Sequence, residues 1–318
     1  MRYMFKILIN IALIVMFITP FKADSQQEYF FKNSSTLGIE FNYQWQSEDG
    51  IRKLKFLLTH TDIDKLPTSA PAYNTLLAQN YIHRNLLEYA KTIDPKIANI
   101  SIKRSAGSLN MQVSGKYPEQ IDKITATLGK KHEEAEAEYL TKNYYVPFKN
   151  EMGRLTIKQD HRRYAEESSN HLSGVVLAIK EQLNNPNNAR EFIDFTLNWL
   201  QTIPYDTLEN RISSNGSGFA APQQLLLNNR GDCDSKSTLF LALLKSYNPT
   251  LSAKMVFLRN HALVGVNMNP NETDAQIVQN NLSYILAEPT GAAQYKLGEI
   301  APSSQIAIRN QQFTTELF

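Results

Sequence analysis

The only cysteine of this 318-residue chain lies where a nucleophile would be expected. Cys233 belongs to the sequence Arg-Gly-Asp-Cys-Asp-Ser-Lys-Ser (Arg230–Ser237), in which a glycine turn leads directly into an apolar helix pattern over residues 238–244. The first turn of a helix offers free backbone N–H groups and the positive end of the helix dipole, and both stabilise a thiolate. The position of Cys233 therefore predicts nucleophilic chemistry.

A histidine and an acid follow the cysteine at similar intervals. His261 lies on an apparent strand 28 residues after Cys233, and Glu288 lies at the end of another strand 27 residues further on. In thiol enzymes a histidine accepts the proton of the cysteine, and a third polar group orients the imidazole. The order cysteine, histidine, acid thus predicts a catalytic triad of Cys233, His261 and Glu288.

Each of these residues also has a purely structural interpretation. A lone cysteine can be a small buried hydrophobic residue, His261 can be a core histidine bonded to the backbone, and Glu288 can be a surface carboxylate. Unpaired carboxylates beside a thiol would raise its pKa. We therefore interpret Asp232 and Asp234 as helix caps or braces of the loop, with Lys236 offsetting their charge.

The remaining histidines form no metal-binding pattern. Neither a His-Glu-x-x-His sequence nor a pair of cysteines accompanies them, and the chain contains no Gly-x-Gly-x-x-Gly or phosphate-loop motif. We therefore expect no metal and no cofactor. The separate histidines are His60, His83, His132, His161 and His171.

The first residues have the features of a secretory signal peptide. Arg2 and Lys6 precede an apolar run from Ile7 to Thr19, and Ala23 and Ser25 fit the small-x-small pattern of a cleavage site. The apolar run is shorter than the roughly 20 residues that span a bilayer as a helix. We expect cleavage near these two small residues and a periplasmic or secreted protein, with an uncleaved anchor as the alternative.

Charge narrows the choice of partners for the mature protein. Loss of residues 1–25 removes three of the 33 basic residues and one of the 31 acidic residues, so the net charge is close to zero. Nucleic acids and anionic membranes attract clustered Lys and Arg. We expect a protein or peptide substrate, with a cell-envelope component as one candidate, no nucleic acid, and no integral membrane domain after cleavage. A secreted chain with one cysteine also keeps a free thiol.

Residues 26–150 are expected to form an N-terminal α+β domain of unknown role. Alternating apolar residues predict a hairpin over 39–58 with an Asp-Gly turn, followed by a helix over 73–91. The same order then repeats less clearly. Alternation over 100–113 predicts a second hairpin, and another helix begins near Pro118.

Residues 151–318 are expected to form a second domain that carries the chemistry. The stretch over 144–153 is interpreted as the passage between the two domains. Asp160 is expected to cap a helix that runs through Ile179, and a second helix begins after the Asn-rich segment 184–188.

The segment from Ala189 to Gly291 resembles the core of the transglutaminase-like superfamily of papain-type thiol enzymes. The resemblance rests on Ile203-Pro-Tyr205, on the sequence Leu225–Arg230, and on the Gly-Asp-Cys-Asp signature of residues 231–234. A histidine and an acid follow this signature in the order that the family has.

The resemblance implies an α+β fold with a C-terminal papain/transglutaminase-like core. In that core the helix bearing Cys233 packs on an antiparallel sheet that carries His261 and Glu288, and here an N-terminal α+β domain of hairpin–helix units precedes it. Family members usually have Asp or Asn as the third residue and an aromatic residue two positions after the histidine. This chain has Glu288 and Leu263 there.

The triad and the resemblance together imply a cysteine-dependent acyl-transfer enzyme. The thiolate of Cys233 would attack an amide or ester carbonyl and form an acyl-thioester, while His261 carries the proton and Glu288 holds the imidazole. Water is the default acceptor, so we expect a peptidase or amidase. A protein cross-linking transglutaminase and a non-catalytic envelope protein that binds peptides are the alternatives.

An oxyanion formed in this reaction needs hydrogen-bond donors. The backbone N–H of Cys233 is the first donor that we expect. Tyr205, Gln224 and Asn229 are candidates for the second by their position in the segment that resembles the family.

Overall fold

The computed structural model describes residues 27–318, apart from 106–107, 151, 211–213, 215 and 292. The expected signal peptide lies outside the described residues, as does the Ala106-Gly107 turn of the second expected hairpin. In the part of the chain that is described, no helix combines the length and the apolar character needed to cross a membrane.

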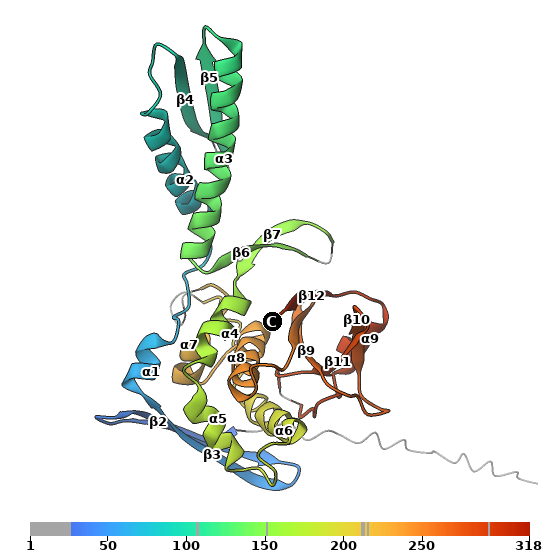
Figure 1. The fold of residues 1–318 in the computed structure, drawn as a ribbon. Coiled ribbons are helices and arrows are strands. Elements are labelled where there is room, and N and C mark those ends of the chain that lie inside the picture. Colours follow the sequence, from blue (N-terminus) through green and yellow to red (C-terminus); the bar gives the residue numbers. More distant parts are fainter. Residues whose placement is uncertain (1–26, 106–107, 151, 211–213, 215, 292) are drawn as a thin grey trace, which may run out of the picture.

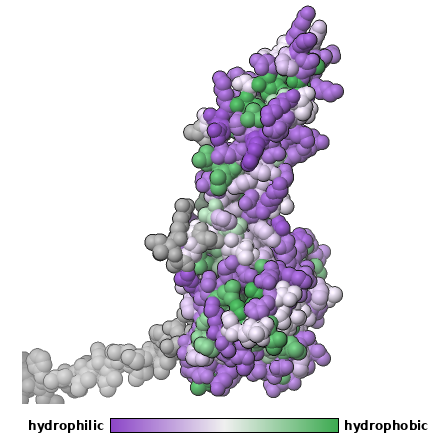
Figure 2. Space-filling view, turned by 90° about the vertical axis from the view of Figure 1, so that its left-hand side faces the viewer, coloured by the Kyte–Doolittle hydropathy of each residue, from purple (hydrophilic) through white to green (hydrophobic). Residues whose placement is uncertain are grey.

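The chain forms a body of helices and sheets from which a narrow arm projects (Figure 1). The arm has an apolar core of its own that includes Leu86 and Leu128, both nearly inaccessible to solvent. Hydrophobic residues also reach the surface on the arm and on the body (Figure 2). The arm comprises α2 (Thr75–Ala90), β4 (Ala98–Ser105), β5 (Ser108–Gly115) and α3 (Pro118–Lys142).

The elements of the arm are those that the sequence predicts. The helix expected over 73–91 is α2, and Asn74 caps it by accepting hydrogen bonds from two backbone N–H groups of the first turn. The second hairpin pairs β4 with β5, antiparallel, and Ile100 lies opposite Val113. The helix expected near Pro118 begins at that residue, which suits a first helical position because it has no N–H to satisfy.

The first predicted hairpin belongs to a three-stranded antiparallel sheet. β2 (Gly38–Ser47) pairs with β3 (Gly50–Thr59) along its whole length, as the alternation predicts, and β1 (Gln27–Ser34) pairs with the other edge of β2. The turn requires a positive φ of 112° at Gly50, which glycine adopts without steric cost.

The inner face of this sheet is part of the body core. The ring of Trp45 meets Phe195 edge-on, and the ring of Phe56 meets Trp199 in the same way. The indole N–H of Trp45 donates to Asn198 Oδ1 at 2.7 Å, so the buried polar atom is satisfied. Each fully buried aromatic side chain of this kind stabilises the fold by about 1.5–3 kcal/mol.

The packing therefore groups the chain differently from the expected division at residue 150. Residues of β2 and β3 share one core with residues 165–297, whereas the core of the arm is built from residues 82–135. An alternating strand indicates that one face is buried, but it does not indicate which distant segment covers that face. The body thus takes elements from both sides of the expected boundary.

The stretch that we interpreted as a passage is a paired hairpin. β6 (Tyr145–Lys149) and β7 (Leu155–Gln159) are antiparallel, and they connect α3 of the arm to the body. Tyr144 begins this connection with a positive φ of 57°, and its ring stacks on Tyr164 with centroids 4.5 Å apart. Aromatic stacking therefore fixes the base of the arm on the body.

The helix expected from Asp160 through Ile179 is two helices. Asp160 caps the first as predicted, accepting a hydrogen bond from the backbone N–H of Arg163 at 3.1 Å. The chain then turns between the helices, and Gly174 approaches β3 so closely that a Cβ atom would lie 2.8 Å from the carbonyl oxygen of Leu57. The two helices are α4 (His161–Ser169) and α5 (Ser173–Lys180).

A buried helix, α8 (Cys233–Tyr247), runs through the centre of the body. Every residue from Ser235 to Leu244 is buried, because α8 is packed against α4, α5, α6, α7 and one strand of the largest sheet. Asn188 caps α6 as the Asn-rich segment predicts. The bounds of α6 are Ala189–Leu200 and those of α7 are Pro222–Asn228, while α1 (His60–Lys65) contacts β2 and β3.

The largest sheet has five antiparallel strands in the order β10-β11-β9-β8-β12 and curls beside α8 (Figure 1). Together with the helices it gives a mixed α+β fold with antiparallel sheets, which confirms the fold class at this level. Its elements are β8 (Ala253–Leu258), β9 (His261–Asn267), β10 (Gln276–Gln279), β11 (Leu282–Ala287) and β12 (Thr314–Leu317), with α9 (Pro302–Arg309) between β11 and β12.

Candidate active site

The loop before α8 places Cys233 at the first position of the helix. The loop is closely packed at Gly231, where a Cβ atom would lie 2.9 Å from the end of the Leu225 side chain. Asp232 is the helix cap, and its carboxylate accepts a hydrogen bond from the backbone N–H of Ser235 at 2.9 Å. Cys233 therefore lies in the first turn, where backbone N–H groups have no partner within the helix.

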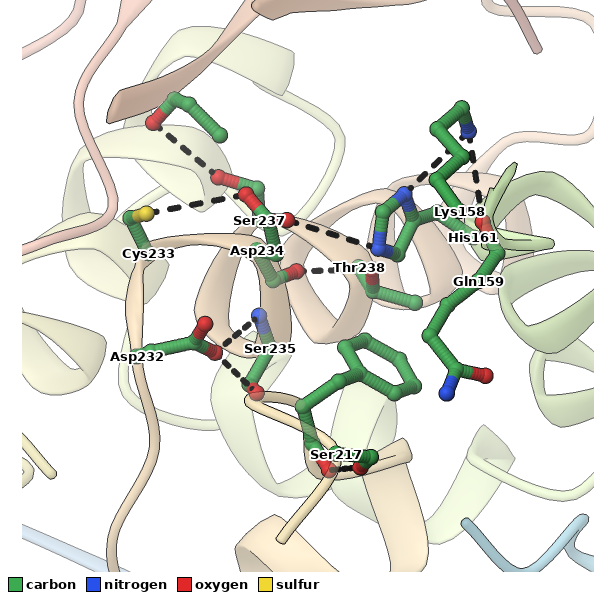
Figure 3. Close-up of polar contacts among 12 residues, drawn as sticks. Lys158, Gln159, His161, Ser217, Asp232, Cys233, Asp234, Ser235, Ser237 and Thr238 are labelled. Atoms are coloured by element: carbon green, nitrogen blue, oxygen red, sulfur yellow. Dashed lines mark hydrogen bonds and ion pairs between the residues drawn. The ribbon is translucent and has the colours of Figure 1, made fainter. Parts of the chain in front are cut away.

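The thiol of Cys233 lies between its own helix and strand β9. It donates to Asp234 Oδ1 at 3.5 Å (Figure 3), and it accepts a hydrogen bond from the backbone N–H of Ala262. Ser237, one turn further along α8, donates to the carbonyl oxygen of Ala262 at 3.3 Å. Two contacts to one residue of β9 thus hold the start of α8 against the strand that begins at His261.

His261 and Glu288 meet at the end of the sheet. Nε2 of His261 lies 3.0 Å from Oε1 of Glu288. The other carboxylate oxygen of Glu288 accepts a hydrogen bond from the backbone N–H of Ala301 at 2.7 Å, and the carbonyl oxygen of Glu288 accepts one from Gln201. Glu288 is only 5% exposed, so a buried and well-held carboxylate orients the imidazole.

Cys233 and His261 are neighbours without a direct hydrogen bond. The thiol contacts the backbone N–H of Ala262, and His261 is the residue directly before Ala262 in the chain. Since Nε2 of His261 faces Glu288, Nδ1 is the nitrogen left for the thiol. Among the described residues no hydrogen bond joins the thiol to that imidazole, and the thiol proton is directed to Asp234 instead.

The surroundings of Cys233 favour the thiol over the thiolate. Burial raises the pKa of Cys233 well above its usual range, and the Asp234 and Asp232 carboxylates raise it further. The N–H of Ala262 acts in the opposite direction, because it stabilises the thiolate. Burial, followed by the charge of Asp234, raises the pKa of Asp232 to about 7.

A buried lysine lies beneath the start of α8. Lys236 is inaccessible to solvent, and its ammonium donates to the carbonyl oxygen of Ile203. Burial lowers the pKa of Lys236 to about 8, although Asp232 and Cys233 oppose this shift. Lys236 therefore supplies the opposing charge that the sequence suggested, and it also fixes the loop that leads to Tyr205.

The three candidates for a second oxyanion donor lie in different places. Tyr205 pairs with Gly231 in an isolated parallel bridge, and burial raises the pKa of its phenol. Gln224 accepts hydrogen bonds from the backbone and side chain of Ser69, and Asn229 exchanges hydrogen bonds with Gln27. Tyr205 is thus the candidate whose backbone is joined to the loop that leads into Cys233.

Sequence reasoning missed the contribution of α4 to this region. His161 is buried, and its Nε2 lies 3.6 Å from Oδ2 of Asp234. It precedes Cys233 by 72 residues, and no motif surrounds it. A histidine directly after a predicted helix cap was the only local signal. In the described part of the chain, no group of three potential metal ligands occurs.

Comparisons with protein-family models, with curated proteins and with solved structures found no match to this chain. The chemistry of the site is therefore inferred from its own geometry. That geometry brings a thiol, an imidazole and two carboxylates together at the junction of α8 with the sheet.

Proposed function

We propose that the protein is a cysteine-dependent acyl-transfer enzyme that acts as a peptidase or amidase. The observation that carries this proposal is the 3.0 Å contact between Nε2 of His261 and Oε1 of Glu288, beside a helix that begins with Cys233. A carboxylate on one ring nitrogen fixes the tautomer and leaves the other nitrogen to act as a base.

The proton and the acyl group move in a balanced sequence in this mechanism. Nδ1 of His261 takes the proton of Cys233, and the resulting thiolate attacks the carbonyl carbon of the substrate. The imidazolium, stabilised by Glu288, then gives its proton to the leaving amine, and an acyl-thioester remains on Cys233. Water, activated by the same imidazole, hydrolyses the thioester and restores the thiol.

The oxyanion of the tetrahedral intermediate needs donors near the sulfur. The backbone N–H of Cys233 supports this role, because it lies in the first turn of α8. Tyr205 is the second donor that we propose, since its backbone bridges to Gly231, two residues before Cys233.

We further propose that residues 189–291 form a papain/transglutaminase-like core. A nucleophile at the start of a central helix, packed on an antiparallel sheet that carries the histidine, supports this assignment. The substrate that we propose is a protein or peptide, and the location that we propose is the periplasm or the extracellular space. The signal-peptide pattern of residues 1–25 supports that location.

A non-catalytic role in peptide binding is the second candidate. The observation that favours it is the raised pKa of Cys233, since a protonated thiol is a poor nucleophile. A binding protein would keep its affinity for peptides when Cys233 is replaced by alanine, and neither ammonia nor cleaved peptide would be released.

The test is hydrolysis of a denatured protein such as casein, with ammonia and new amino termini measured separately. We expect activity in the natural chain and none in Cys233→Ala, while His60→Ala serves as a matched histidine control outside the site. His60 is exposed, and its ring nitrogen Nε2 lies 2.9 Å from the carbonyl oxygen of Ser35, away from the site. Full activity in Cys233→Ala would refute the proposal, and amine incorporation in place of hydrolysis would indicate cross-linking.

A further inference from the structure

Asp234 is free to act on the thiol because another residue caps the helix. Asp232 accepts the hydrogen bond from Ser235 N that defines the cap. Asp234 lies in the first turn, and the cap geometry does not involve its carboxylate. Its two oxygens instead face the Cys233 thiol and a buried histidine.

A chain of polar contacts extends from the nucleophile to the last strand of the sheet, and Figure 3 shows its part from Cys233 to Lys158. Asp234 Oδ2 lies 3.6 Å from Nε2 of His161, and Nδ1 of His161 lies 3.3 Å from Nζ of Lys158. The same ammonium donates to Glu316 at 2.6 Å. Lys158 and Glu316 are mostly buried, at 14% and 24% side-chain exposure, so this ion pair is sheltered from solvent.

The donor and acceptor roles in this chain are determined by Lys158. A lysine ammonium can only donate, so Nδ1 of His161 must accept, and the ring proton must lie on Nε2. Nε2–H therefore points at the Asp234 carboxylate. Burial and the charge of Lys158 lower the pKa of His161, which keeps the ring neutral and preserves this tautomer.

His161 is held in place by packing as well as by polar contacts. Its ring meets Phe219 at 62° with centroids 5.0 Å apart, and it lies 5.8 Å from the Phe257 ring. A histidine confined between two aromatic rings has little rotational freedom, so the position of its Nε2–H is fixed. The Asp234 carboxylate is fixed in turn.

We propose that Asp234, oriented by His161, is a positioning residue that holds the Cys233 thiol in its protonated form until the thiol proton is passed to His261. This inference rests on the proposed function, because it concerns the same nucleophile. In this proposal the S–H group of Cys233 has two alternative acceptors. Asp234 accepts its hydrogen bond in the absence of substrate, and Nδ1 of His261 takes its proton in the reaction.

The other charged and titratable groups around the thiol come from several elements. The negative charge of Asp232 acts on both Tyr205 and Cys233, and that of Glu209 acts on Tyr205. The positive charges of Lys158 and His261 act on Asp234. Removal of the Asp234 charge alone leaves all of these groups in place. In the described part of the chain these groups are Lys158, His161, Tyr205, Glu209, Asp232, Lys236, His261 and Glu288.

The test is the pH dependence of Cys233 alkylation by iodoacetamide, which needs no substrate. We expect the midpoint to move to lower pH in Asp234→Asn by about one unit, which at pH 7 corresponds to an alkylation rate about tenfold higher. Asp232→Asn is the matched control, since it removes the other flanking carboxylate, and asparagine still caps a helix. We expect a smaller shift there, because Asp232 faces Ser235.

A shift in Asp234→Asn that is no larger than the shift in Asp232→Asn would overturn the proposal. A second measurement examines His161 directly through its ring ¹⁵N chemical shifts. We expect a neutral Nε2–H tautomer from pH 5 to pH 8, and titration near its ordinary pKa or an Nδ1–H tautomer would contradict the orientation of Asp234. Neither result depends on hydrolysis, so failure of the positioning role is distinct from failure of the proposed function.

Discussion

The two sides of the nucleophile are built in opposite ways. On the sheet side, His261 and Glu288 come from the ends of neighbouring strands, and the imidazole is about one-quarter exposed. On the helix side, Asp234 contacts a histidine that is almost completely buried, and a lysine is bonded to that histidine. An exposed imidazole can exchange protons with substrate and water, whereas a buried one can only fix its neighbour. This difference supports the proposal that the sheet side performs the chemistry while the helix side controls the thiol.

We expect the largest loss of hydrolytic activity from His261→Ala, a variant of the sheet side. We expect hydrolysis to fall by about 10³-fold, because a positioned general base contributes 10²–10⁴-fold and the thiol proton loses its acceptor. The measurement is kcat/KM on the same protein substrate, with the His60→Ala variant as the control. Equal losses of kcat/KM in His261→Ala and His60→Ala would contradict a special role of the sheet side in the reaction.

Glu288→Gln should have a smaller effect of the same kind. The amide keeps the volume of the side chain and can still contact Nε2 of His261, but it cannot stabilise the imidazolium by charge. We expect kcat to fall by about 10²-fold with little change in KM, because the interaction strengthens only when the ring becomes charged. A change confined to KM would assign Glu288 to substrate binding and contradict the triad.

Asp232 offers a third test through folding stability. Its pKa in the folded protein is raised to about 7, above the usual value of an unfolded aspartate, so the folded state binds more protons between these two values. The free energy of unfolding should therefore decrease as the pH rises from about 4 to 7. In Asp232→Asn this decrease should be smaller. Urea unfolding at several pH values measures it, and identical slopes in the two proteins would contradict the raised pKa.

Local patterns predicted the elements better than their arrangement. The alternation over 39–58 predicted the hairpin, and the side chains of Asp160 and Asn188 cap helices as expected, because these features depend on neighbouring residues. The covering of that hairpin depends on Trp199 and Phe195, which are far away in the chain. No local pattern encodes such a contact, so the division at residue 150 did not anticipate the core of the body.

The candidate site shows the same contrast. Cys233 and His261 were selected by their positions at the start of a helix and on a strand, and Glu288 by its order after them, and all three lie around the junction of α8 with the sheet. His161 could not be selected, because its role depends on α4 packing against the first turn of α8. Of the two aspartates that we interpreted as caps or loop braces, Asp232 is the cap, and Asp234 contacts the thiol and His161 instead.

The central claim is that Cys233 becomes acylated with the help of His261, and trapping that intermediate tests it most directly. The full chain is mixed with a peptide ester, quenched in acid after short intervals, and analysed by mass spectrometry. We predict a mass increase equal to the acyl group on the peptide that contains Cys233, removable by hydroxylamine and formed far more slowly in His261→Ala. Absence of the adduct in the natural chain, or its formation at the same rate in His261→Ala, would contradict the account.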